Sequence, residues 1–215
     1  RQLVEGASRW TNTLKREGIQ PGEVVVLILQ HGFDLIHAYW GTILHGAIPS
    51  IMPFLTEKLQ PERYRADLSA LVGITCPECI VTYREFADEV NAALPEGSSV
   101  RRVIVSDELE PEEKVEVDSF TGLQRNENDI VLLQHSSGTT GLQKGVALSH
   151  GAVLRQLESY SLALKTNDRD VIVSWLPLYH DMGLIAGFLM PILKRIPLVL
   201  LSPFEWVRAP ARLMQ

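Results

Sequence analysis

The sequence predicts an α/β fold in which mainly parallel sheets are flanked by helices. Two observations indicate this fold: short β-branched runs alternate with segments of helical periodicity, and several of those runs are apolar throughout. A strand that is apolar on both sides is buried on both sides, as in a parallel sheet between two layers of helices. The chain has 215 residues, 46% of them hydrophobic, which is enough to bury such a core.

Before residue 106 the pattern changes repeatedly from helix to strand. Leu3, Ala7, Trp10 and Leu14 recur at helical spacing, and Gly18 ends that segment. Glycine and proline mark most of the other changes. The elements that follow are a strand at 24–29, a helix at 33–44 stopped by Gly46, a strand at 47–52, a helix at 61–71, a strand ending near 83, a helix at 84–93 and a strand at 100–105.

An acidic stretch divides the chain. Residues 107–118 contain seven acidic residues, one Lys and one Pro, which is typical of a solvated connector. We therefore expect two α/β subdomains, with the first at 1–106, the acidic connector at 107–128 and a second segment at 129–215.

Strands and helices alternate again after the connector. Apolar runs predict strands on both sides of a Gly-rich loop, and Ser149 is a candidate N-cap for the helix that follows. The expected elements are strands at 129–134 and 145–149, a helix at 151–164, a strand at 171–175, a helix at 183–193 and a strand at 197–201.

Composition argues against several classes of partner. The net charge of -6 and the pI near 5.5 do not suit nucleic acid, whose partners present clustered Lys and Arg. The most apolar stretch, 182–193, is broken by Pro191 and is shorter than the about 20 residues of a transmembrane helix, so we assign it to the core.

The chain begins at Arg1 inside a helical pattern, so we expect it to be cut from a longer protein. We expect that protein to be cytoplasmic.

Cys76 and Cys79 form a CxxC pair, a pattern typical of either a redox motif or half of a zinc site. A structural zinc site needs four ligands, and the sequence offers no second pair of ligands. A redox pair gains thiolate character at a helix N-terminus, whereas Cys79 begins a strand-like run. We therefore predict a structural role for both cysteines and no metal ligands.

The Gly-rich loop between the strands at 129–134 and 145–149 carries the most chemical information. Its glycines let backbone N–H groups converge on an anion, its hydroxyls donate to phosphate oxygens, and its lysine supplies a positive charge. We expect this loop to bind a polyphosphate through these residues: Ser136, Ser137, Gly138, Thr139, Thr140, Gly141, Lys144 and Gly145.

The loops of two other nucleotide-binding classes fit this sequence less well. A P-loop NTPase needs Gly-Lys followed at once by Ser or Thr, whereas Lys144 lies between Gln143 and Gly145. The dinucleotide fingerprint GxGxxG is absent, and a small-molecule kinase would need an acidic metal-binding pair at the end of a strand. A Ser/Thr/Gly hairpin without function remains the simplest alternative.

Residues 136–145 resemble the phosphate-loop signature of the adenylate-forming (AMP-binding) enzymes. That superfamily includes acyl-CoA synthetases, acyl-AMP ligases, nonribosomal-peptide adenylation domains and luciferases. Its signature is two small hydroxyl residues, Gly, Thr, Thr, Gly, any residue, Pro, Lys and Gly. The sequence departs from it at Gln143, which replaces the usual proline and loosens the turn without removing a phosphate donor.

Two further segments support the resemblance. Residues 175–184, Trp-Leu-Pro-Leu-Tyr-His-Asp-Met-Gly-Leu, look like the family's next motif, and His180 matches the side chain at the junction of the carboxylate and the α-phosphate. Residues 41–49 resemble the family's early helix-to-strand segment and carry no chemistry. The sequence of residues 179–184, together with that of residues 202–203 and 208–212, looks most like the fatty acyl-AMP ligase branch.

The resemblance implies that ATP and Mg²⁺ are used to activate a carboxylic acid, here a fatty acid, to acyl-AMP with release of pyrophosphate. His180 would be catalytic, and an acyl carrier protein or coenzyme A would accept the acyl group. The family's Tyr-Gly-x-Thr-Glu segment, ribose-binding Asp, hinge and C-terminal Lys are not in this sequence. We therefore expect the chain alone to be inactive, and a nonenzymatic nucleotide-binding or scaffolding module is the alternative.

Overall fold

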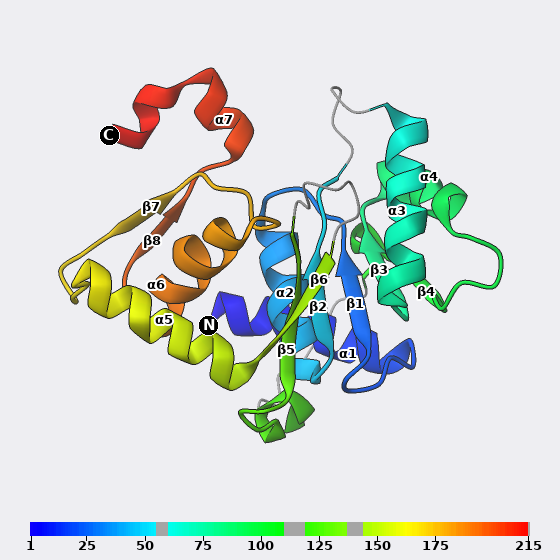
Figure 1. Ribbon diagram of the computed structural model, residues 1–215, viewed down its shortest axis with the longest axis horizontal. Coiled ribbons are helices and arrows are strands. Elements are labelled where there is room, and N and C mark those ends of the chain that lie inside the picture. The colour runs from blue at the N-terminus through cyan, green and yellow to red at the C-terminus, as the bar shows by residue number, and fades with distance from the viewer. Residues whose placement is uncertain (55–59, 110–118, 137–143, 215) are drawn as a thin grey trace.

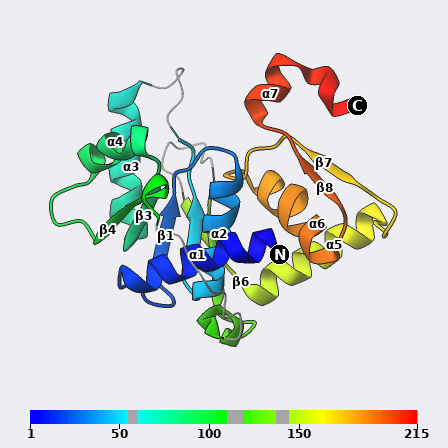
Figure 2. The ribbon, with the colours of Figure 1, turned by 180° about the vertical axis from the view of Figure 1, so that it is seen from behind.

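The computed structural model describes residues 1–54, 60–109, 119–136 and 144–214 (Figures 1 and 2). Its helices and strands alternate along the chain, as the sequence predicts. Besides short 3-10 turns, the helices are α1 (Gln2–Arg16), α2 (Phe33–His45), α3 (Pro61–Thr75), α4 (Ala87–Ala93), α5 (His150–Leu164), the π-helix η5 (Met182–Leu189), α6 (Met190–Lys194) and α7 (Pro203–Arg208). The strands are β1 (Val24–Leu27), β2 (Ile48–Ile51), β3 (Cys79–Thr82), β4 (Arg102–Val105), β5 (Ile130–Ser136), β6 (Lys144–Ser149), β7 (Ile172–Ser174) and β8 (Leu198–Leu200).

The first part of the chain forms a four-stranded parallel sheet in the order β2-β1-β3-β4. Both faces of β1 are buried, because Val25 belongs to one hydrophobic cluster and the next residue, Val26, to another. The first cluster contains side chains of α1 and α2, and the second contains side chains of α3 and α4. These helix pairs cover opposite faces of the sheet, as the uniformly apolar strands predict (Figure 1).

Close contacts and caps explain several element boundaries. An ideal Cβ on Gly41 would lie 2.3 Å from Trp10 Cβ, so the absence of a side chain allows α1 and α2 to pack tightly. Gly46 ends α2 with a φ of 88°, a left-handed conformation that glycine adopts without strain. Ser149 accepts a hydrogen bond from the N–H of Ala152 and thereby caps α5, which confirms the predicted N-cap.

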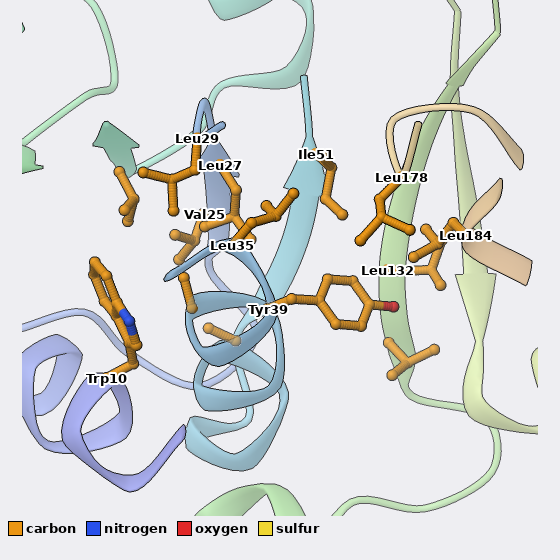
Figure 3. Packing of buried hydrophobic residues seen from close by; sticks show 14 of the residues in the cluster. Trp10, Val25, Leu27, Leu29, Leu35, Tyr39, Ile51, Leu132, Leu178 and Leu184 are labelled. Atoms are coloured by element: carbon orange, nitrogen blue, oxygen red, sulfur yellow. The ribbon is translucent and has the colours of Figure 1, made fainter. Parts of the chain in front are cut away.

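Strands β5 and β6 form an antiparallel pair, unlike the other strand pairs of the described chain, which are parallel. The sequence places a loop between these strands but does not specify their direction. The pair is a separate two-stranded sheet, and β5 lies beside β2, the edge strand of the four-stranded sheet (Figure 1). Leu132 of β5 packs in the same cluster as Tyr39 of α2 (Figure 3).

The helix expected at 183–193 is two elements in the structure. The π-helix η5 changes to the short α-helix α6 at Met190, and Pro191 is in the first turn of α6. Proline has no N–H to donate to the preceding turn, so it favours a break in hydrogen-bond register at this point.

The first hydrophobic cluster, which contains Val25, draws side chains from both sides of the acidic stretch. The subdomain boundary at 107–128 stays a prediction. Residues 110–118 of that stretch lie outside the described residues.

The two cysteines are free thiols. Cys79 is buried in β3, and burial raises the pKa of its thiol well above the usual range. Cys76 is exposed and ends α3 with a φ of 44°. Across the described ranges, no cluster of three or more His, Cys, Asp or Glu side chains could hold a metal ion. Within the same ranges, no helix is both long enough and apolar enough to cross a membrane.

Candidate active site

The strands that flank the predicted phosphate loop bring its two ends together. Ser136 at the end of β5 pairs with Lys144 at the start of β6, and His135 pairs with Gly145. A phosphate-binding turn needs this arrangement, because its donors must converge on one anion. The side chains of Ser136 and Lys144 lie outside the described part of the chain, together with the remaining predicted binding residues: Ser137, Gly138, Thr139, Thr140 and Gly141.

His180 lies in a turn between β7 and η5. Its N–H donates to the carbonyl oxygen of Pro177 (3.1 Å), and its carbonyl oxygen accepts from the N–H of Leu184 (2.9 Å). The Asp181 carboxylate accepts from the N–H of Met182 (2.7 Å), which satisfies one of the free amides at the helix start. The backbone of His180 is therefore fixed, whereas its imidazole ring is exposed and accessible to a ligand.

A side-chain hydrogen bond joins the hairpin to the His180 turn. Gln134, two residues before Ser136, donates from Nε2 to the carbonyl oxygen of Tyr179 (2.9 Å), although the two residues are 45 positions apart. Apolar packing reinforces this contact: Leu132 of β5 and Leu178 of the turn belong to the same cluster (Figure 3). The structure thus places the strand that leads into the phosphate loop beside the turn that bears His180.

The close packing around Gly183 explains why the motif at 175–184 has a glycine at this position. An ideal Cβ at this position would lie 2.2 Å from the carbonyl oxygen of Pro177, a backbone atom that cannot move aside without shifting the turn. Gly187, one turn later, would place a Cβ 2.7 Å from the Ser174 hydroxyl. The two glycines let η5 pack directly on the end of β7, and this packing positions His180 at the helix start.

Burial changes the acid-base properties of the groups around the site. Burial lowers the pKa of His135, and neither of its ring nitrogens has a hydrogen-bond partner among the described residues. Burial also raises the pKa of the Tyr179 phenol, whose ring lies 4.8 Å from that of His180, centroid to centroid. The neutral forms of both side chains are thereby favoured close to the proposed anion site.

Sequence reasoning missed Gln134 and His135 as parts of the site. The available signal was a pair of polar residues at the end of an otherwise apolar strand, immediately before a phosphate-loop signature. When a strand buries polar side chains, those side chains need a hydrogen-bond partner or a functional role. The sequence does not name the partner of Gln134, because that partner is a backbone carbonyl in a distant turn.

A cavity of about 400 Å³ lies at the opposite edge of the sheet, between α4 and the edge strand β4. Arg101 and Arg102 line it, but Arg101 is paired with Glu23 and Arg102 with Glu17. Because each guanidinium already has a carboxylate partner, this cavity is a poor candidate for a polyphosphate site. The hairpin and the His180 turn remain the better candidate.

The family model described as AMP-binding enzyme matches residues 1–215, the whole of the sequence. The chain belongs to the AMP-binding enzyme family. Among curated relatives, it is 31% identical over 202 residues to the 4-hydroxyphenylalkanoate adenylyltransferase of Mycobacterium tuberculosis. It is 30% identical over 201 residues to the long-chain-fatty-acid–AMP ligase FadD26 of Mycobacterium bovis.

Solved structures of the family share the fold. The fatty acid AMP ligase from Legionella pneumophila is 29% identical and superposes with a TM-score of 0.81, covering 98% of this chain. A fatty acyl-adenylate ligase from L. pneumophila, solved with acyl adenylate and pyrophosphate, is 31% identical with a TM-score of 0.79. These matches confirm the expected α/β fold and the predicted resemblance to fatty acyl-AMP ligases.

The chain spans about a third of the length of these relatives. The match to the adenylyltransferase covers 90% of this chain and 32% of that protein, and the match to FadD26 covers 91% and 33%. Against the two L. pneumophila structures the coverage is 35% of each.

Proposed function

We propose that this AMP-binding enzyme takes part in the ATP-dependent activation of a carboxylic acid to acyl-AMP. The observation that carries the proposal is the match over 98% of the chain to a ligase solved with acyl adenylate and pyrophosphate, the two products of such a reaction. The juxtaposition of the hairpin and the His180 turn supports it, because one would hold the polyphosphate and the other would meet the acid.

In the proposed reaction, a carboxylate oxygen attacks the α-phosphorus of ATP while the bond from that phosphorus to the pyrophosphate oxygen breaks. The obstacle is largely electrostatic, since an anion approaches a polyanion. The loop donors Ser136, Ser137, Thr139 and Thr140, with the loop amides and Lys144, would hold the β- and γ-phosphates and stabilise the departing pyrophosphate.

His180 would position the incoming carboxylate. Its fixed backbone and exposed ring suit a side chain that contacts a ligand from a constant place, which is the requirement of a positioning group. Mg²⁺ would neutralise phosphate charge during the transfer. No residue of the described chain is assigned to the metal, because none of the described side chains forms a cluster able to hold it.

The acid is proposed to be a fatty acid, and the acceptor an acyl carrier protein or coenzyme A. We choose a fatty acid because several relatives are named as fatty acid ligases. Another relative, however, is named for 4-hydroxyphenylalkanoates. A test panel therefore needs both straight-chain fatty acids and hydroxyphenyl-substituted acids. A cytoplasmic location remains a prediction of the sequence.

Acid-dependent exchange of labelled pyrophosphate into ATP tests the proposal. The 215-residue chain is expected to show no exchange, because it spans only about a third of its relatives. A form extended to the relatives' full length is expected to exchange with at least one acid of the panel, and the same form carrying His180→Ala is expected to lose most of that rate. An extended form that binds ATP but exchanges with no acid would support the nonenzymatic alternative.

A further inference from the structure

We infer that Gln134 is a positioning residue that sets the place of the His180 turn along β5, the strand that leads into the predicted phosphate loop. The inference rests on the proposed function for its consequence, but its physical basis is the hydrogen bond from Gln134 Nε2 to the carbonyl oxygen of Tyr179. Gln134 is 9% exposed, so water competes weakly for this bond.

The contacts of His180 given so far are local: its ring lies beside the ring of the preceding Tyr179, with 4.8 Å between the centroids. The hydrogen bonds of its backbone go to Pro177 and Leu184, which belong to the same turn and the same helix. These bonds fix the shape of the turn but not its distance from β5. The packing of η5 on the end of β7 places the helix start, and contacts between the turn and β5 add the position of the turn along β5.

Two contacts between β5 and the turn differ in what they determine. Apolar packing of Leu132 with Leu178 holds the two segments together but tolerates sliding along the strand, because it is not directional (Figure 3). The hydrogen bond from Gln134 is directional, so it sets the register of the turn along β5. Gln134 thus holds the His180 turn in a set position along β5, the strand that ends at Ser136.

The orientation of the Gln134 amide follows from its partner. A backbone carbonyl only accepts, so the nitrogen Nε2 must face Tyr179 and the oxygen Oε1 must face away. Oε1 is buried and has no donor among the described residues. The amide is therefore held in place by its donor side, and a side chain of equal length without a donor should release the turn.

The test uses two substitutions of similar shape. Gln134→Met removes the donor, and Gln134→Glu, studied at pH 8, replaces it with an oxygen that repels the Tyr179 carbonyl. Gln156→Met, on the exposed face of α5, is the matched control. The reporters are the imidazole carbon-proton NMR signals of the protein labelled at its six histidines.

Without nucleotide, both Gln134 variants are expected to shift the His180 signal and to leave the His45 signal in place. His45 is a suitable internal standard because its ring is held by the carbonyl oxygen of Ile19 (2.7 Å), in another part of the fold. The control should leave both signals unchanged. An unmoved His180 signal in both variants, or a shift of His45 as large as that of His180, would overturn the inference.

Addition of ATP with Mg²⁺ separates this inference from the proposed function. In the wild type, ATP should shift the His180 signal. In Gln134→Met, the affinity measured by calorimetry should stay within about threefold, while the ATP-induced shift falls by half or more. An unchanged shift with unchanged affinity would remove the coupling role of Gln134 and leave the proposed function intact. Failure of ATP to bind the wild type would contradict the proposed function, and the nucleotide-free spectra would still decide the role of Gln134.

Discussion

The sheet β2-β1-β3-β4 and the strand pair β7–β8 are both parallel, but they differ in how they are covered. In the first, Val25 and Val26 are each 0% exposed, so adjacent residues of one strand are buried on opposite faces. In the second, Val173 is 42% exposed and Val199 is 46% exposed, although they pair with each other. Parallel strands are normally covered on both faces, so the β7–β8 pair lacks part of the packing that the first sheet has.

This contrast indicates how stability and chemistry are divided. Most of the fully buried side chains belong to the first sheet and its helices, and burial is the main source of folding free energy. The candidate site lies where the hairpin meets the segment that follows β7. The first region thus serves as the rigid support, and the second contributes His180 from a less buried part of the chain.

The largest expected effect comes from a pair of leucines on helices of the two regions. Leu14 of α1 is 0% exposed, and Leu162 of α5 is 70% exposed. Leu14→Ala should lower the free energy of unfolding by about 3 kcal/mol, whereas Leu162→Ala should change it by less than about 0.5 kcal/mol. Urea denaturation followed by circular dichroism measures both values. Equal losses would show that the two regions are equally packed.

A pair of glycines gives the next largest effect. Gly183→Ala places a Cβ against the Pro177 carbonyl and should cost about 2 kcal/mol. Gly73→Ala in α3 meets open space and should stabilise the chain by about 0.5 kcal/mol through helix propensity. Thermal denaturation of both variants should give shifts of opposite sign. A neutral Gly183→Ala would mean that the His180 turn is not tightly held.

The attachment of α7 is expected to give a smaller and local effect. Trp206 stacks on Trp175 with ring centroids 3.7 Å apart, and Phe204 contacts Phe54. Trp206→Ala should remove about 1 kcal/mol of local stability. Hydrogen exchange should therefore accelerate in α7 and remain unchanged in α2. Slow exchange of α7 in the variant would show that other contacts hold this helix.

The smallest effect is a pH dependence from the partly buried His135. Burial lowers its pKa, so below about pH 6.5 the unfolded chain binds more protons than the folded one. The contribution of His135 is complete above that pH and is lost as the pH falls toward its lowered pKa. His135→Phe should reduce the loss of unfolding free energy between pH 7.5 and 5.5, measured by urea denaturation. An unchanged loss would assign it to the other histidines whose pKa burial lowers: His31, His37, His45 and His150.

Features set by neighbouring residues could be predicted from the sequence. The end of α2 at Gly46 and the cap at Ser149 need only a local signal, and both are confirmed. The loop between two strands was also predicted, but neither the direction of their pairing nor the register that brings Ser136 opposite Lys144 was. The signature at 136–145 identified the family because it is long and specific.

Features set by distant residues could not be predicted. The bond from Gln134 to Tyr179 joins residues 45 positions apart, and no periodicity reports such a contact. The π-helix arises in a segment whose composition equally suits an α-helix, and close contacts of Gly183 and Gly187 with the preceding strand and turn accompany it. Tertiary packing therefore decided these features over local propensity.

The most direct test of a nucleotide site shared by the hairpin and the His180 turn is a map of ATP binding by backbone amide NMR shifts of the labelled chain. We expect the largest shifts in residues 136–145 and 177–184, the two segments that Gln134 joins. Shifts concentrated instead around Arg101 and Arg102 at the opposite edge of the sheet, or no shifts at millimolar ATP, would contradict such a site.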